Sequence, residues 1–199
     1  MEAKRGSPLL LLLPLVSMTI IFFIHGCSAM GEEKMLVGHG RRKPCKTIVF
    51  YLHDLLYDET NIKNFTSVIV ATPSWDVKNK LSLKFFGFGE MVVFNDPLTV
   101  GRSLGSRELG RAEGFYFYDN KKIFSLWFGM TLTLNTTKYN GTISLAGANH
   151  LMEKTRDMPV IGGTGDFFMT RGIATIITDE VQNSNYFRIR VDVKLYECY

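Results

Sequence analysis

Apolar and polar residues alternate along much of the chain from residue 47 to its end, and turn signals interrupt the alternation at short intervals. Alternation places successive side chains on opposite faces of a strand, and no helical spacing follows the N-terminal region. The pattern predicts about eight strands, as in a sandwich or a closed antiparallel barrel. The expected strands are Thr47–Leu56, Thr66–Ala71, Phe85–Phe94, Gly114–Tyr118, Phe124–Leu134, Thr142–Asn149, Phe167–Thr178 and Asn185–Glu197.

The remaining segments are expected to be loops and turns. Residues 95–97 (Asn-Asp-Pro) are expected to end the third strand, and Asn140-Gly141 should form a tight hairpin turn. Residues 150–165 are expected to form a loop. The glycine cluster at 162–165 lacks the lysine spacing of a phosphate-binding loop and no helix follows it, so a tight turn is expected there.

The first strand carries a carboxyl group on an otherwise apolar face. Asp54 shares that face with Ile48, Phe50 and Leu52. Burying an ionised carboxylate is costly, so Asp54 should be paired or have a raised pKa, and it then can donate a proton near neutral pH. Alternatively, the strand ends near Leu52 and Asp54 faces water in a turn. His53 points to the opposite face, so its position beside Asp54 does not make a catalytic dyad.

An aromatic strand offers a second candidate feature. Its phenylalanines lie on one face, while Tyr116 and Tyr118 lie on the other. Two phenols on one face can line a pocket for an aromatic ligand through stacking and hydrogen bonds. The alternative is an ordinary half-exposed strand.

The N-terminus is typical of a secretory signal peptide over residues 1–29. Lys4 and Arg5 provide the positive start, and residues 8–24 are mostly apolar. A signal anchor is the alternative, although the run is short for a membrane span and is broken by polar residues.

The rest of the chain is expected to be a flexible segment at residues 30–44 and one domain at residues 45–199. The formal net charge is +4, without long basic runs, and nothing resembles a nucleic-acid-binding module. Serine-elbow, zinc-helix and C-x-x-C motifs are absent from the sequence, and its histidines are scattered. No metal site, serine triad or cofactor is therefore expected.

Cysteines and glycosylation motifs agree with export. Of three cysteines, one lies in the signal region, which leaves Cys45 and Cys198 as an even pair. In an oxidising compartment such a pair suggests a disulfide that ties the two ends of the domain together. Sequons for N-glycosylation begin at Asn64, Asn135 and Asn140.

Several short motifs, in a fixed order from about Pro44 to the end, carry a family resemblance. They are Phe50–Asp54, Asp96–Thr99, Gly110–Tyr116, Lys138–Thr142, Met158–Gly165 and Leu195–Tyr199. Together they resemble the plant dirigent family, and the cysteine pair resembles that of its lignan-forming branch. The resemblance implies an eight-stranded antiparallel barrel of the dirigent and allene oxide cyclase type, usually a homotrimer, secreted to the apoplast.

The resemblance also implies an activity. Lignan-forming members have no oxidising centre, and a laccase or peroxidase makes phenoxy radicals from a monolignol such as coniferyl alcohol. The barrel holds the radicals or the resulting quinone methides so that one isomer of a lignan such as pinoresinol forms. Radical coupling has little barrier, so orientation is what the protein contributes. Ring closure of a bis-quinone methide then needs an acid.

The family's pocket carries over residue by residue. Asp54 matches its acid, and Arg156 matches its pocket arginine. Asn149 departs from the pattern, because lignan-forming members tend to have aspartate there and an amide cannot act as a carboxylic acid. This protein is therefore expected to couple weakly, to use a different phenol, or to cyclise on one side with Asp54 alone. The matching wall positions are Tyr116, Tyr118, Thr178 and Phe187.

Two other functions stay open. One is a true cyclase or dehydratase that acts through a quinone methide on an isoflavonoid-type phenol, which needs no added oxidase. The other is a non-catalytic secreted protein that binds phenolics or wall polymers in defence, which leaves product distributions unchanged.

Overall fold

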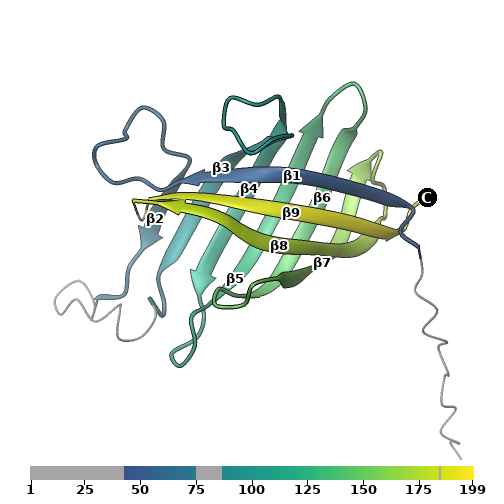
Figure 1. Ribbon diagram of the computed structural model, residues 1–199. Coiled ribbons are helices and arrows are strands. Elements are labelled where there is room, and N and C mark those ends of the chain that lie inside the picture. Colours follow the sequence, from purple (N-terminus) through teal and green to yellow (C-terminus); the bar gives the residue numbers. More distant parts are fainter. Residues whose placement is uncertain (1–42, 75–86, 184) are drawn as a thin grey trace, which may run out of the picture. The chain divides into compact units, whose positions relative to one another are not determined.

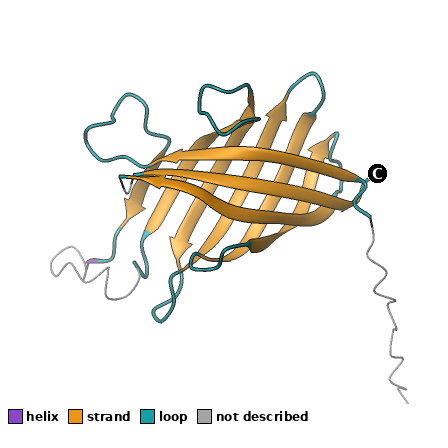
Figure 2. Ribbon diagram, viewed as in Figure 1, coloured by secondary structure: helices purple, strands orange, loops and turns teal. Residues whose placement is uncertain are grey.

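The computed structural model describes residues 43–74, 87–183 and 185–199. The expected signal peptide and almost all of the expected flexible segment lie outside these ranges, as does the expected start of the third strand. Most of the described chain is strand, joined by loops at the strand ends (Figure 2). Within these ranges, no helix is long and apolar enough to cross a membrane.

The described strands form one antiparallel sheet that closes on itself. Strand β1 pairs with β9 along one edge and with β3 along the other, so the eight longer strands make a closed barrel, as predicted (Figure 1). The short strand β2 pairs with the first half of β3. The strands are β1 Lys46–Leu55, β2 Ser67–Ala71, β3 Met91–Thr99, β4 Glu108–Tyr118, β5 Ser125–Asn135, β6 Asn140–His150, β7 Arg156–Gly165, β8 Arg171–Gln182 and β9 Tyr186–Glu197.

Alternating residues of each strand fill the barrel interior. Along β9, Val191, Val193 and Leu195 are buried, whereas Lys194 between them is exposed, as the pattern predicts. Removal of such apolar side chains from water is the main stabilising contribution to a closed barrel. Residues with no exposed area come from different strands and meet in the core: Phe50, Leu98, Ala112, Ile143, Ala174 and Val193.

The prediction of a loop at residues 150–165 is wrong for most of this segment, because residues 156–165 form β7 between β6 and β8. Glycines and Pro159 lower the strand propensity of this segment, so its sequence does not show the pattern of a strand. Close packing requires glycine at positions 163 and 165, whereas a Cβ at Gly162 would meet open space. A Cβ at Gly163 would lie 2.5 Å from the carbonyl oxygens of Thr142 and Phe167. Strand β8 correspondingly begins at Arg171, after a turn that contains Phe167.

The strand end expected at residues 95–97 is also wrong, because β3 continues through Pro97 to Thr99. The amide of Asn95 donates to the carbonyl of Thr66 at 2.8 Å, away from β4. Alternate backbone nitrogens point the same way, so the nitrogen of Pro97 also faces this side, where β2 gives way to β1. The missing N–H of Pro97 therefore costs no bond to β4.

Two further boundaries differ from expectation. Strand β4 begins at Glu108, well before Gly114. Asn140-Gly141 is not the hairpin turn, since these residues open β6 and the turn occupies residues 136–139. Gly141 is needed for a different reason: its φ is 149°, and a Cβ there would lie 2.1 Å from the carbonyl oxygen of Thr164.

A disulfide joins the start of β1 to the end of β9, as predicted. Cys45 and Cys198 are bonded, with a Cα–Cα distance of 6.4 Å. The amide of Cys45 also donates to the carbonyl of Leu195 at 2.8 Å. Figure 1 shows the C-terminus beside the start of β1.

We expect the Cys45→Ser/Cys198→Ser variant to be less stable than the wild type. The bond spans 153 residues of sequence, and closing so long a loop removes unfolded-state entropy equivalent to about 5 kcal/mol as an upper value. Urea denaturation in non-reducing buffer should show the lower midpoint. As a control, a reductant should lower the midpoint of the wild type and leave the variant unchanged. Equal midpoints for the two proteins would contradict the stabilising role.

Candidate functional site

Asp54 lies inside the barrel. Strand β1 continues to Leu55, and only 7% of the Asp54 surface is exposed, so it does not face water in a turn. The hydroxyl of Ser67 donates a short hydrogen bond to its Oδ1. Burial raises the pKa of Asp54 to about 6, and the bond from Ser67 opposes this rise. Asp54 is therefore a carboxyl group that remains largely protonated in mildly acidic solution.

The two tyrosines of β4 share the inner face with Asp54, as the pattern predicts. Tyr116 packs against Phe128 with ring centroids 5.0 Å apart, and Tyr118 stacks on Phe124 at 5.7 Å. Burial, followed by nearby negative charges that include Asp54, raises the pKa of both phenols, that of Tyr118 to about 12. Both side chains are thus neutral aromatic surfaces with a hydroxyl that can donate.

Phe187 also belongs to this group. It is the direct cross-strand partner of Asp54 in the β1–β9 ladder, so the two side chains lie on the same face of the sheet. Phe187 is half-buried. An aromatic ring beside the acid lowers the local polarity and adds a surface on which a phenolic ring can stack.

Arg156 and Thr178 form a second polar group. Arg156 is 4% exposed, and its Nη2 donates to Thr178 Oγ1 at 2.9 Å. Its Nη1 donates to the carbonyls of Leu151 and Glu153 at 3.4 and 3.3 Å. Burial lowers the pKa of Arg156, and Glu153 opposes this effect. Thr178 is exposed, so this part of the site is open to solvent.

Asn149 is near the end of β6, and Arg156 starts β7, the antiparallel strand paired with β6. Asn149 is 2% exposed, and its Oδ1 has no hydrogen-bond partner within the described part of the chain; the same holds for Nε of Arg156. Buried polar atoms without partners are costly, so both atoms are available to a ligand. A cross-strand row connects this group to the acid, because Leu126 pairs with Asn149 on one side and Tyr118 on the other.

Asp96 is a buried carboxyl group that sequence reasoning missed. It is 1% exposed, and Thr66 Oγ1 donates to its Oδ1 at 2.6 Å. Burial and then the charge of Asp54 raise its pKa well above the ordinary range. A signal was present in the sequence, since Asp96 follows alternate apolar residues as Asp54 does, but the adjacent Pro97 suggested a turn.

His53 is buried on the outer face of β1, as expected from the alternation, and makes no dyad with Asp54. Its ring nitrogens lie 2.7 Å from Thr99 Oγ1 and 2.8 Å from the hydroxyl of Tyr186. The Thr99 hydroxyl donates to the carbonyl of Gly101, so it accepts from His53 Nε2–H. Burial and then Arg188 lower the pKa of His53. Through these two hydrogen bonds, a neutral His53 links β1 to Tyr186 of β9 and to Thr99 at the end of β3.

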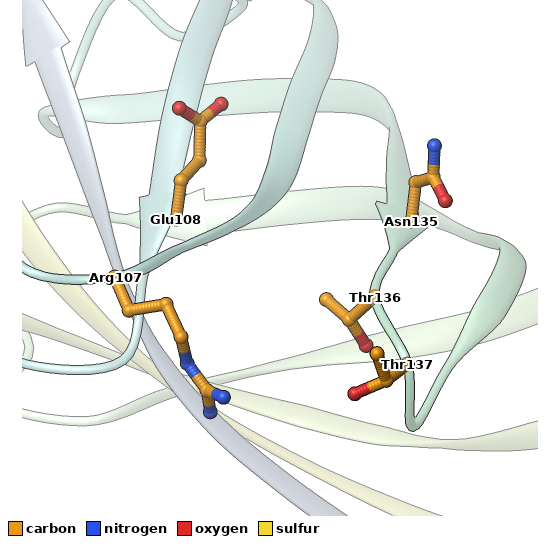
Figure 3. A pocket seen from close by; sticks show the side chains of 5 residues that line it. All are labelled: Arg107, Glu108, Asn135, Thr136 and Thr137. Atoms are coloured by element: carbon orange, nitrogen blue, oxygen red, sulfur yellow. The ribbon is translucent and has the colours of Figure 1, made fainter.

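The predicted sequon asparagines and a separate pocket lie elsewhere on the surface. Asn64, Asn135 and Asn140 are all exposed. A pocket at the start of β4 and the end of β5 has a volume of about 530 Å³. Figure 3 shows the residues that line it: Arg107, Glu108, Asn135, Thr136 and Thr137. None of the predicted acid or aromatic residues lines it. Over the described ranges, no group of three or more His, Cys, Asp or Glu is placed to hold a metal ion.

A closed barrel of this size can hold one small ligand, and this one offers buried acids, neutral phenols and a guanidinium toward its interior. The protein is thus a closed antiparallel barrel with acidic, phenolic and cationic side chains on its inner face. Residues 45–196 match the family model described as Dirigent-like protein. The chain belongs to the dirigent family.

Relatives of this chain include named dirigent proteins. It is 45% identical to Dirigent protein 5 of Arabidopsis thaliana over 157 residues, which covers 79% of this chain and 82% of the relative. It is 44% identical to a dirigent protein of Sinopodophyllum hexandrum over 180 residues, 90% of this chain and 93% of the relative. The solved structure of the pterocarpan synthase dirigent protein GePTS1 matches with a TM-score of 0.66 and 31% identity, covering 75% of this chain and 88% of that one.

The buried acid predicts how stability changes with pH. Folded Asp54 holds its proton up to about pH 6, whereas its ordinary pKa is 3.8. Between pH 3.8 and about 6 the folded state therefore binds more protons than the unfolded state. The free energy of unfolding falls as pH rises through this range, and Asp54 accounts for about 3 kcal/mol of the fall. In Asp54→Asn the free energy of unfolding should depend less on pH over this range. Urea denaturation of both proteins across this range measures it, and parallel curves for the two would contradict the raised pKa.

Proposed function

We propose that this protein directs the regio- and stereoselective coupling of monolignol phenoxy radicals, such as those of coniferyl alcohol, to a lignan such as pinoresinol. A separate laccase or peroxidase makes the radicals. The observation that carries the proposal is the buried, partly protonated Asp54 among Tyr116, Tyr118 and Phe187 in a closed barrel. Membership of the family and the similarity to a dirigent protein of Sinopodophyllum hexandrum support it.

The aromatic residues account for selectivity. Radical coupling needs little activation, so the isomer that forms depends on how the two rings are held when they meet. Tyr116 and Phe187 offer aromatic surfaces beside the acid, and the phenol hydroxyls offer hydrogen bonds. A rigid strand position gives each contact a fixed direction.

The acid accounts for ring closure. Coupling leaves a bis-quinone methide, and each ring closes when a side-chain hydroxyl oxygen bonds to the benzylic carbon. The quinone methide oxygen takes up a proton as the ring becomes aromatic, and the attacking hydroxyl releases one. Asp54, with a pKa near 6, is suited to supply the first proton. The step is an isomerisation and consumes no oxidant.

The second polar group would hold the far end of the substrate. Arg156 Nε–H can donate to an oxygen of the ligand, and Asn149 Oδ1 can accept from a hydroxyl. A phenol with an ortho methoxy group presents both kinds of atom side by side. Asn149 in this role is a hydrogen-bonding residue and not an acid.

A second candidate is a cyclase or dehydratase that acts through a quinone methide. The chain is 38% identical to Pterocarpan synthase 1 of Glycyrrhiza echinata over 127 residues, 63% of each protein. The same acid would serve such a reaction. Turnover of an isoflavonoid-type alcohol without added oxidase separates this candidate from the first.

The protein is also proposed to be a secreted homotrimer. The disulfide and the exposed sequon asparagines support secretion. The outer face of the barrel carries exposed apolar side chains, including Phe115, Ile161 and Ile173, which support association with further copies.

We expect Asp54→Asn to abolish the selectivity of closed-product formation while the barrel stays folded. Without the acid the bis-quinone methide is not closed inside the barrel, so pinoresinol comes only from coupling and closure in solution. Purified protein is mixed with coniferyl alcohol and a non-selective oxidase, and chiral chromatography of the dimers gives the enantiomer ratio. The wild type should enrich one enantiomer of pinoresinol, and the variant should give a racemic mixture, as oxidase alone does. Loss of a general acid commonly lowers the rate of the catalysed step, here ring closure, by about 10²–10⁴-fold.

Asp157→Asn is the matched control. Asp157 also lies in a strand and accepts a bond from a threonine hydroxyl, that of Thr175 at 2.7 Å, but it is exposed. This variant should keep wild-type selectivity. Unchanged handedness in Asp54→Asn would remove Asp54 from the mechanism.

We expect Asn149→Asp not to raise the yield of closed product. Position 149 is near the end of β6 and Arg156 starts β7, the strand paired with β6, and a nearby guanidinium stabilises the ionised form of a carboxyl, which is a poor acid. The same assay with the product quantified measures this. A clear rise in yield would mean that the amide at position 149 limits ring closure.

A further inference from the structure

The register of the barrel seam brings two carboxyl groups together. Strand β1 pairs with β3 through Leu52 and Leu98. Two residues further along each antiparallel strand lie Asp54 and Asp96, close enough for the charge of Asp54 to act on Asp96. Alternation puts both on the inner face with the two leucines. Both are also buried, with 7% and 1% of their surface exposed.

The chain between these strands holds the two carboxyls in place. Thr66 lies between β1 and β3, because its amide donates to the carbonyl of Leu55 and its carbonyl accepts from Asn95, both at 2.8 Å. Its hydroxyl donates to Asp96 at 2.6 Å, and the hydroxyl of the next residue, Ser67, donates to Asp54. Consecutive hydroxyls therefore fix the two acids separately, and each acid keeps a second oxygen for other partners.

The charged and titratable groups around the acids do not neutralise them. From β4, Tyr116 and Tyr118 present neutral phenols, and Glu90 adds a negative charge nearby. Arg111 favours the charged form of Asp96 and so opposes the rise of its pKa, but its side chain bonds to Asn95 on the outer face. His53 of β1 points outward and is neutral. Two buried carboxyls so placed cannot both ionise at low cost.

Building on the proposed function, we propose that Asp96 is a second acid of the site and that Asp54 and Asp96 share one proton as an acid–carboxylate pair. The protonated carboxyl gives its proton to the quinone methide oxygen. The carboxylate takes the proton that the attacking hydroxyl releases as the new C–O bond forms. The pair ends each ring closure with one proton, so it is ready for the second closure.

With Asp96 as the second acid, the mechanism does not require an acid at position 149. The second acid lies beside the first, across the seam between β1 and β3. One pair can then assist both ring closures if the intermediate turns over within the barrel between them.

The shared proton is tested without substrate. Carbon-13 NMR of labelled aspartate carboxyls follows Asp54 and Asp96 against pH in the wild type, in Asp96→Asn and in the control Asp157→Asn. In the wild type, both signals should shift in two common steps, since coupled groups titrate as a unit. In Asp96→Asn the upper step should vanish, and Asp54 should titrate once, releasing the last proton at lower pH. The same single step for Asp54 in wild type and Asp96→Asn would overturn the pair.

The catalytic part is tested by chirally resolved coupling of coniferyl alcohol with an added oxidase across pH. The alkaline limit of selectivity should move to lower pH in Asp96→Asn and stay in place in Asp157→Asn. An unmoved limit in Asp96→Asn would overturn the role of Asp96. Racemic product from the wild type itself would contradict the proposed function. In that case the NMR titration, which needs no substrate, still tests the shared proton.

A second variant covers the case in which Asp96→Asn does not fold. Thr66→Val keeps the side-chain shape but removes the hydroxyl that stabilises ionised Asp96. The upper NMR step should then move to higher pH, opposite in direction to the loss seen in Asp96→Asn. An upper step at the wild-type pH in a folded Thr66→Val protein would show that Asp96 takes no part in that step and would overturn the pair.

Discussion

Strand β1 has to pair with both β9 and β3, and the rest of the structure depends on this closure. Without it the sheet would have two open edges, and its inner face would be exposed to water. The β1–β3 ladder is short, since only Tyr51 and Leu52 pair across it before Thr66 enters between the strands. The disulfide fixes the opposite end of β1 to β9. The seam is thus secured by backbone pairing, inserted hydroxyl residues and a covalent bond.

The same seam carries the acids, and this has a cost. Asp54 and Asp96 would be better solvated outside the barrel, and their burial makes the folded state less stable as pH rises. Functional groups are commonly kept in environments that destabilise the fold, and the surrounding packing compensates. Here the compensation comes from strand pairing and from the hydroxyls of Thr66 and Ser67, which satisfy one oxygen of each acid.

The interior is asymmetric in its chemistry. One group, around Asp54, can give a proton, whereas the other, around Arg156, is cationic and has unpaired polar atoms. The row from Tyr118 through Leu126 to Asn149 joins them. Both candidate functions use this arrangement in the same way, to hold and protonate a quinone methide. They differ in how the quinone methide arises, by radical coupling or from a single phenolic alcohol.

Several local features could be predicted from the sequence: alternation along β1 and β9, the shared face of the β4 tyrosines and the export-type cysteine pair. The inward position of Asp54 was one of two predictions, and the continuation of β1 to Leu55 selects it. The side-chain period of a strand is local, so it can be read from neighbouring residues. Strand β7 was not predicted because its glycines and Pro159 resemble turn residues, and Asp96 was not predicted because the adjacent Pro97 does. The strands that close the barrel and the nearness of Asp96 to Asp54 could not be predicted, because register between strands distant in sequence depends on packing of the whole sheet.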